Sequence, residues 1–166
     1  MVEIRSVGVM GAGQMGSGIA HVCALAGLDV GLYDIARDRL EACLNVVSAN
    51  LGRQVASKKI TEEQRREALS RIKLLTDLEG FADTDLVIEA VTENETIKRK
   101  ALSQLCPELK PEAMIGTNTS SVSITRLAAS TDRPERFIGI HFMNPVPVMQ
   151  LVELVRGIAT EDETFE

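Results

Sequence analysis

Three spaced glycines and a later aspartate are the residues whose spacing most clearly implies a chemistry. Gly11, Gly13 and Gly16 follow an apolar run over residues 7–10, and Asp34 ends a second apolar run, 18 residues after Gly16. In a unit of strand, tight turn and helix, the first glycine permits the turn and the second lets the backbone approach a pyrophosphate. The third glycine lets the helix pack closely against the strand. The pattern therefore predicts a dinucleotide-binding site.

The residues around this turn also indicate which dinucleotide is bound. The predicted helix begins at Ala12, where free N–H groups and the positive end of the helix dipole favour phosphate oxygens. A carboxylate at the end of the second strand can accept hydrogen bonds from both hydroxyls of an adenosine ribose. A 2′-phosphate would be repelled by Asp34, so we expect NAD rather than NADP. The alternative is an ordinary glycine-rich turn with a solvated aspartate.

A histidine and a glutamate near the end of the chain could act on a proton. His141 lies at the end of one apolar run, and Glu153 lies 12 residues later, within the apolar run 151–155. A carboxylate in such a strand is costly to bury without a partner, and we expect His141 to be that partner. A carboxylate on one imidazole nitrogen fixes the tautomer and makes the other nitrogen a better base. The simpler alternatives are a core histidine and a glutamate on an exposed sheet edge.

Polar residues follow two of the predicted strands, at the edge where open α/β sheets bind ligands. Residues 117–121, which include Ser120, follow one strand, and Glu93 and Lys98 follow another. Their hydroxyl, amide and charged groups could contact a ligand, although the same residue types also begin helices. His21 lies on the first predicted helix without an acidic neighbour, and we expect a structural role for it.

Apolar periodicity predicts strands that alternate with helices. Strands are expected at residues 4–10, 29–33, 86–91, 113–117, 137–142 and 151–155, and helices at residues 12–26, 95–109 and 123–129. This alternation indicates an α/β fold of the Rossmann type, with a doubly wound, mostly parallel sheet and right-handed crossovers. The segment 36–75 is too long for a single crossover helix, and its i, i+3, i+4 apolar spacing predicts a helical hairpin.

Two capping boxes mark further helix starts. The first begins at Thr61, inside the predicted hairpin, whose tip carries Arg53, Lys58 and Lys59. A solvated charged surface is the simplest interpretation of that tip. The second begins at Thr160, close to the last residue of the sequence. Because a helix that starts there has no body, we expect the natural protein to continue beyond residue 166.

The composition excludes several classes of protein. The chain has 166 residues and a net charge of −6, which argues against nucleic acid as the main partner because phosphate binding needs a basic surface. No apolar run approaches the roughly 18 residues of a membrane helix, and the charged start does not resemble a signal peptide. Cys23, Cys43 and Cys106 are widely spaced, so we expect reduced, buried thiols in a cytoplasmic protein. Their spacing fits no metal site, and no metal is expected.

Four segments together resemble the NAD-binding domain of the 3-hydroxyacyl-CoA dehydrogenase family. They are residues 11–20 (GAGQMGSGIA), 89–94 (EAVTEN), 118–121 (NTSS) and 141–153 (HFMNPVPVMQLVE). They occur in the family's order and spacing over nearly the whole chain. The glycine motif is shared by many families, whereas the last segment is specific to this one. The resemblance extends to bacterial 3-hydroxybutyryl-CoA dehydrogenases and to the dehydrogenase part of multifunctional fatty-acid oxidation proteins.

The resemblance implies an activity and a role for each matching residue. The activity would be the reversible, NAD-dependent oxidation of 3-hydroxyacyl-CoA to 3-oxoacyl-CoA in fatty-acid or butanoate metabolism. His141 would be the catalytic base and Glu153 its orienting partner, while Ser120 and Asn144 would contact the reacting oxygen and the nicotinamide end of the cofactor. The other implied contacts are those of Gly11, Gly13, Gln14, Met15, Gly16, Asp34, Glu93 and Lys98 with NAD, and those of Arg53, Lys58 and Lys59 with coenzyme A.

The chain departs from the family in length. The family has a second, helical domain that dimerises, closes the cleft and supplies a further polar residue to the substrate, and nothing in this sequence corresponds to it. We therefore expect residues 1–166 to be an NAD-binding domain with little turnover of its own, from a homodimeric parent protein. Two alternatives remain, a dehydrogenase of another hydroxy acid, of the gulonate or lens-crystallin type, and a non-catalytic nucleotide-binding module. Only a CoA substrate would use the basic tip of the hairpin.

Overall fold

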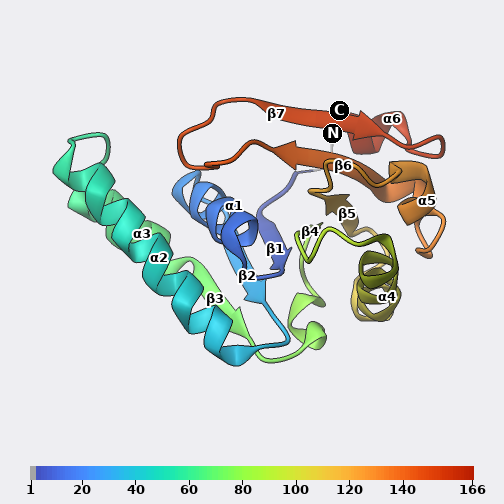
Figure 1. Cartoon of the computed structure of the whole chain (residues 1–166), viewed down its shortest axis with the longest axis horizontal. Helices are drawn as coiled ribbons and strands as arrows, with labels where there is room; N and C mark the ends of the chain where they lie inside the picture. The colour runs from blue at the N-terminus through green and yellow to red at the C-terminus, as the bar shows by residue number, and fades with distance from the viewer. Residues whose placement is uncertain (1–2) are drawn as a thin grey trace.

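A seven-stranded sheet with helices on both faces forms the body of the molecule (Figure 1). The computed structural model describes residues 3–166. The strands are β1 Ser6–Met10, β2 Asp29–Tyr33, β3 Ile72–Leu75, β4 Leu86–Glu89, β5 Met114–Thr117, β6 Phe137–Phe142 and β7 Val152–Arg156. The helices are α1 Gln14–Leu25, α2 Arg37–Ala56, α3 Glu62–Ser70, α4 Glu95–Leu105, α5 Ile124–Ala128 and α6 Asp162–Phe165, with short 3-10 turns at Leu78–Phe81, Cys106–Glu108 and Pro134–Arg136.

The strand order confirms the predicted doubly wound fold. It runs β3-β2-β1-β4-β5-β6-β7, and every neighbouring pair is parallel except β6 and β7. Helices α1, α2 and α3 lie to one side of the sheet, and α4 and α5 lie to the other (Figure 1). All residues of β4 and β5 are buried, as expected for parallel strands covered on both faces. The order reverses between β1 and β4, which is where such sheets bind ligands.

The predicted helical hairpin is present as α2 and α3, which extend away from the sheet (Figure 1). The capping box at Thr61 forms as predicted, because its hydroxyl accepts from the Gln64 N–H and the Gln64 side chain accepts from the Thr61 N–H. The predicted end of the hairpin at residue 75 is wrong. Residues 72–75 form β3, which pairs with β2. This strand was not predicted from the sequence, because it lies at the sheet edge and exposes Lys73 and Leu74.

The hairpin packs on α1 through the predicted apolar stripe of α2. Its members Leu40, Cys43, Val47 and Leu51 are buried. The three cysteines are all buried and unpaired. His21 of α1 is fully buried as well, and its Nε2 lies 3.0 Å from Oε1 of Gln54 on α2. Burial lowers the pKa of His21, against the smaller, opposite effect of the Gln54 contact.

The second predicted capping box is wrong. Thr160 does not cap α6. Instead, its hydroxyl donates to the Phe137 carbonyl at 2.7 Å and accepts from the Gly157 N–H at 2.8 Å. Thr160 therefore ties the segment after β7 back to β6. Within residues 3–166, no helix is both long and apolar enough to cross a bilayer, and no cluster of three His, Cys, Asp or Glu side chains could hold a metal ion.

Candidate active site

The glycine turn between β1 and α1 has the geometry of a backbone cradle. Gly11 has φ +113°, and a Cβ there would lie 2.5 Å from the Ala90 carbonyl oxygen. A Cβ on Gly16 would lie 1.8 Å from the Gly11 carbonyl oxygen, so α1 packs on the turn only because residue 16 is glycine. A Cβ on Gly13 would meet no atom within 4 Å. The backbone at Gly13 therefore faces open space, which a phosphate could approach.

A cleft of about 680 Å³ opens above this turn, between β1, β2 and β4. Gln14 and Met15 line it at the start of α1, and no side chain caps that helix. Asp34 stands at its edge, where its two carboxylate oxygens accept from the N–H groups of Ala12 and Ala36, both at 2.9 Å. The N–H groups of a helix N-terminus fit the phosphates of a dinucleotide, and the carboxylate fits the hydroxyls of its ribose.

Two exposed apolar side chains form the outer part of the same cleft. Ile35 is 91% exposed and Ile97 is 47% exposed, and both line the cleft. Ile35 follows β2, and Ile97 lies in the first turn of α4, the helix that follows β4, so they stand on either side of the switch point. A flat, largely apolar group such as adenine would cover side chains of this kind.

A second cavity, of about 350 Å³, brings together the residues predicted to carry the chemistry. Its walls are formed by Met15, Ala90, Val91, Glu93, Lys98, Asn118, Ser120, His141, Phe142, Met143 and Asn144. Met15, Ala90 and Val91 also line the cleft above the glycine turn, so the two spaces share a wall. A ligand that lies in the cleft could therefore reach the cavity with one end.

His141 and Glu153 are in contact through a cross-strand pair. They lie directly opposite each other in the antiparallel register of β6 and β7, and His141 Nδ1 is 2.9 Å from Glu153 Oε2. The predicted contact is therefore present, but the predicted cause is wrong. Every residue of β7 is exposed, and the Glu153 side chain is 52% exposed. The strand register joins the two side chains, rather than a need to neutralise a buried acid.

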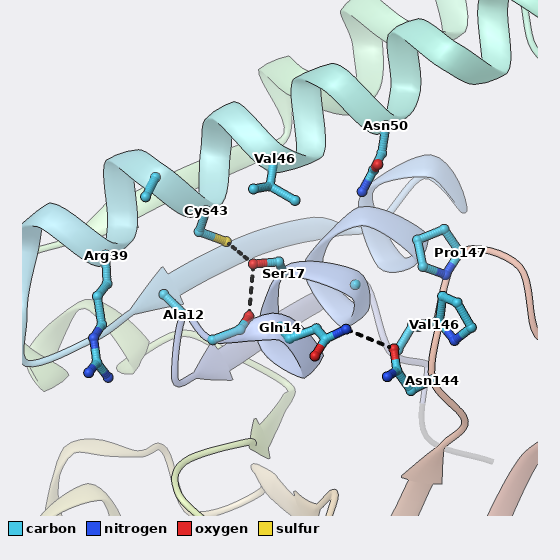
Figure 2. Close-up of a pocket in the computed structure, with 14 residues that line it drawn as sticks. Ala12, Gln14, Ser17, Arg39, Cys43, Val46, Asn50, Asn144, Val146 and Pro147 are labelled. Atoms are coloured by element: carbon cyan, nitrogen blue, oxygen red, sulfur yellow. Dashed lines mark hydrogen bonds between the residues drawn. The ribbon is translucent and has the colours of Figure 1, made fainter.

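Asn144 follows β6 and reaches the start of α1. Gln14 Nε2 donates to Asn144 Oδ1 at 3.3 Å (Figure 2). The loop after Asn144 is held on α1, because Val146 is buried and lies over Gly18, where a Cβ would come within 2.6 Å of it. A cavity of about 470 Å³ lies between this loop, α1 and α2, and extends as far as Asn50 (Figure 2).

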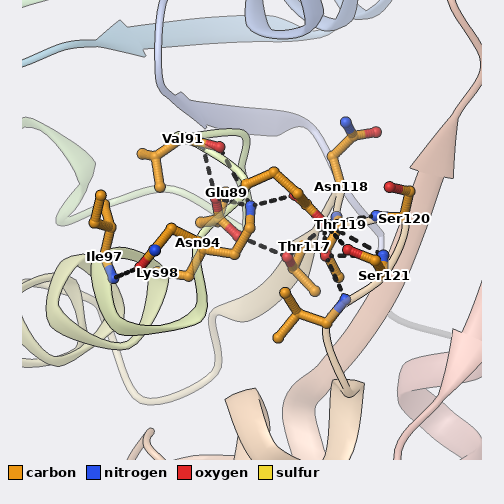
Figure 3. Close-up of polar contacts among 12 residues, drawn as sticks. Glu89, Val91, Asn94, Ile97, Lys98, Thr117, Asn118, Thr119, Ser120 and Ser121 are labelled. Atoms are coloured by element: carbon orange, nitrogen blue, oxygen red, sulfur yellow. Dashed lines mark hydrogen bonds and ion pairs between the residues drawn. The ribbon is translucent and has the colours of Figure 1, made fainter.

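Lys98 lies in a buried ionic network (Figure 3). It is 1% exposed, and its Nζ lies 2.8 Å from Glu89 Oε1 and 3.2 Å from Glu93 Oε2. Thr117 donates to the other oxygen of Glu89 at 2.6 Å. Glu89 was not predicted from the sequence as a site residue. Its signal was an acid at the end of an otherwise apolar strand, nine residues before a lysine on the following helix.

Glu93 connects this network to the loop after β5. Its Oε1 accepts from the Ser120 N–H at 3.1 Å, from the Ser121 hydroxyl at 3.0 Å and from the Thr119 hydroxyl. Burial opposes the charge, but the hydrogen bond from Thr119 and the Lys98 charge outweigh it and lower the pKa of Glu93 to about 2. The carboxylate is therefore ionised at neutral pH, and it fixes the position of Ser120.

The comparisons with known proteins agree with this geometry. Residues 6–166 match the family model described as 3-hydroxyacyl-CoA dehydrogenase, NAD binding domain. The chain belongs to the 3-hydroxyacyl-CoA dehydrogenase family. Within that family it is the NAD-binding domain, and the cofactor that its cleft fits is NAD.

Relatives of this 3-hydroxyacyl-CoA dehydrogenase domain are longer than the chain. The 3-hydroxybutyryl-CoA dehydrogenase of Bradyrhizobium diazoefficiens is 62% identical over 98% of the chain, which covers 56% of that protein. The 3-hydroxyadipyl-CoA dehydrogenase of Escherichia coli is 43% identical, and the chain covers 35% of it. The crystal structure of (S)-3-hydroxybutyryl-CoA dehydrogenase PaaH1 from Ralstonia eutropha matches with a TM-score of 0.95 and 48% identity, over 98% of this chain and 57% of that one.

The basic residues of the hairpin line neither the cleft over the glycine turn nor the cavity that holds His141. Arg53 is in the last turn of α2 and donates to Asn50 Oδ1. Lys58 and Lys59 follow α2, and Lys58 has φ 60°. The cavity of Figure 2 ends near Asn50, so the basic tip lies beyond that end. The structure brings together the residues predicted for the cofactor and the chemistry, but it does not bring Arg53, Lys58 and Lys59 into either space.

Proposed function

We propose that the protein containing this chain is an NAD-dependent dehydrogenase that oxidises a 3-hydroxyacyl-CoA, such as 3-hydroxybutyryl-CoA, reversibly to the 3-oxoacyl-CoA. The observation that carries the proposal is the His141–Glu153 contact, 2.9 Å long, at a cavity that shares a wall with the cleft over the glycine turn. Two of the relatives described above are named 3-hydroxybutyryl-CoA dehydrogenases.

His141 is the proton acceptor in this proposal. Oxidation of a secondary alcohol removes a hydride from the carbon and a proton from the hydroxyl group. Glu153 accepts a hydrogen bond from the Nδ1–H of His141, so the Nε2 lone pair is free to take the hydroxyl proton. The imidazolium that forms is stabilised by the carboxylate. NAD, when bound, accepts the hydride, and the reverse reaction returns the hydride and the proton to the carbonyl.

Ser120 and Asn144 position the reacting oxygen and the nicotinamide end of the cofactor. Both line the His141 cavity. The side-chain oxygen of Asn144 accepts a hydrogen bond from Gln14, so its amide N–H groups are left to contact a ligand. The Ser120 backbone is fixed by Glu93. Held in this way, the two side chains would lose little freedom when the substrate binds, which favours the reaction.

In the same proposal, the residues of the glycine turn would hold the cofactor. Gly13 and the start of α1 would bind its pyrophosphate, and Asp34 would bind its adenosine ribose, which favours NAD over NADP. Gln14 and Met15 line this cleft, and Gly11 and Gly16 shape the turn. Glu93 and Lys98, which line the His141 cavity, would contact the nicotinamide end.

The remaining parts of the proposal concern the partners. Coenzyme A would pass over the hairpin, with its phosphates near Arg53, Lys58 and Lys59. A helical domain beyond this chain would complete the substrate side and form a homodimer. The 166-residue stretch by itself would bind NAD and turn over slowly. The unpaired thiols of Cys23, Cys43 and Cys106 favour the cytoplasm as the compartment.

Replacement of His141 tests the proposal. In the full-length protein, His141→Gln should lower kcat for 3-hydroxybutyryl-CoA by about 10²–10⁴-fold, the usual contribution of a general base. NAD affinity should change by less than about twofold, because His141 does not line the cleft over the glycine turn. His21→Gln is the matched control, since the chain's other histidine lies between α1 and α2, and it should retain kcat. A His141 variant with normal turnover would overturn the proposal.

A further inference from the structure

The Glu89 carboxylate is buried and takes its hydrogen bonds from groups of the protein itself. Glu89 is the last residue of β4 and is 0% exposed. Its Oε1 accepts from the Val91 N–H at 2.7 Å and from Lys98 Nζ at 2.8 Å, and its Oε2 accepts from Thr117 at 2.6 Å (Figure 3). Glu89 does not line the cavity that holds His141, but Lys98 and Glu93 do.

Stability alone does not explain this arrangement. Burial of a carboxylate and an ammonium costs several kcal/mol per ion before their attraction offsets it, and well-packed apolar residues are often as stable or more so. The buried pair is moreover shared with a third group, because Lys98 Nζ also lies 3.2 Å from Glu93 Oε2. Two carboxylates therefore share one ammonium, and the cluster carries a formal net charge of −1.

That charge lies in the wall of the cavity. Glu93 is the exposed member, with a side chain that is 41% exposed, and it faces the cavity together with Ser120 and His141. If Glu89 were neutral, Lys98 would be balanced by Glu93 alone and the wall would carry no net charge. Glu89 thus sets the charge of a wall that it does not itself form.

We propose that Glu89 is a positioning residue that, through Lys98, keeps this wall negative so that the site favours the oxidised over the reduced form of the nicotinamide ring. The inference rests on the proposed function, which brings the nicotinamide end of the cofactor to this cavity. The oxidised ring carries one positive charge and the reduced ring carries none. A negative wall therefore lowers the dissociation constant of NAD⁺ more than that of NADH.

The test compares the two dissociation constants in the full-length protein, by NADH fluorescence and by calorimetry for NAD⁺. In Glu89→Gln, which keeps the shape and removes the charge, the ratio of the NAD⁺ constant to the NADH constant should rise about tenfold. Glu95→Gln is the matched control. This variant also removes one negative charge, but on α4, where Glu95 pairs with Arg126 at 2.8 Å on the surface. The ratio of the two dissociation constants should stay within twofold of the original.

A double variant separates charge from folding. Glu89→Gln with Lys98→Met removes the buried pair as a unit and leaves Glu93 as the only charge, so the net charge is again −1. Its ratio should return to within twofold of the unchanged protein, although both constants rise. A folded Glu89→Gln variant with an unchanged ratio would overturn the inference. If that variant does not fold, a ratio shifted more than fivefold in the double variant would overturn it. Failure of the unchanged protein to bind either nucleotide would instead contradict the proposed function.

Discussion

The two polar clusters at the carboxyl edge of the sheet are built in opposite ways. In the first, Glu89 at the end of β4 and Lys98 on α4 are almost completely buried, and every contact of Glu89 comes from within the chain. At β6 and β7, His141 and Glu153 have side chains that are 24% and 52% exposed, and the whole of β7 faces solvent. Both clusters pair a cationic or basic group with a carboxylate, yet only the first is sheltered from water.

The difference in exposure teaches how firmly each pair is held. Low exposure strengthens electrostatic interactions and fixes side chains, while an exposed pair is screened and mobile. Glu89 and Lys98 are therefore held firmly within the domain. His141 and Glu153 are aligned by the strand register, but in the proposed reaction their charge interactions become strong only when water is excluded from the pair.

Removal of one charged member of each pair should give the largest difference in stability between the two clusters. Lys98→Met leaves two carboxylates without their ammonium, and we expect the free energy of unfolding to fall by about 3–5 kcal/mol. Glu153→Gln, the matched change in the exposed pair, should lower it by less than about 1 kcal/mol. Urea unfolding of both variants gives the two values. Equal losses would mean that burial does not distinguish the clusters.

A methyl group added in the cofactor cleft should lower NAD affinity without lowering the stability of the fold. Gly13→Ala adds a Cβ that meets no protein atom within 4 Å, so the free energy of unfolding should change by less than about 1 kcal/mol. NAD affinity should fall by about tenfold, since the methyl group occupies the path of the pyrophosphate. Gly52→Ala on α2 is the control, because its Cβ would meet only the Arg65 side chain of α3, at 3.8 Å. Calorimetric titration of NAD should show no loss there.

The smallest effect concerns a third buried polar group, His21, on the hairpin side. Burial lowers its pKa in the folded state, so the unfolded chain takes up a proton first, near pH 6.5. His21 therefore leaves stability unaffected above that pH, and stability falls as the pH drops below it, by at most about 1.4 kcal/mol per pH unit. Unfolding curves at pH 7.5 and 5.5 should show a smaller difference for His21→Gln than for the unchanged chain. The same difference in both would show that His21 is not the group that titrates.

Most of the fold was predictable because its signals are local. The glycine spacing, the apolar runs of β1, β2, β4, β5 and β6, and the capping box at Thr61 each lie within a few residues of sequence. β3 was missed because a short edge strand with an exposed lysine has no clear alternation. The cap predicted at Thr160 failed because a tertiary contact with Phe137 competes for the same hydroxyl.

The site was less predictable, because its contacts join distant strands. The pairing of His141 with Glu153 was expected for the wrong reason, since the cause is the strand register and not burial. Glu89 could not be singled out, because its partners Lys98 and Thr117 come from a helix and a strand that only the fold brings together. The sequence singled out Lys98 and Glu93 as candidate site residues, but not Glu89, the buried partner of Lys98.

The position of Glu153 opposite His141 limits which changes in chain length the site can tolerate. Side chains alternate between the two faces of a strand, so a shift of β7 by one residue would turn Glu153 away and place Val152 or Leu154 opposite the histidine. An extra residue at the exposed positions 149–150 could be absorbed by the loop. A deletion inside β7 could not, because no side chain movement restores the pairing. Insertions and deletions in relatives should therefore accumulate in the loop and be absent from β7.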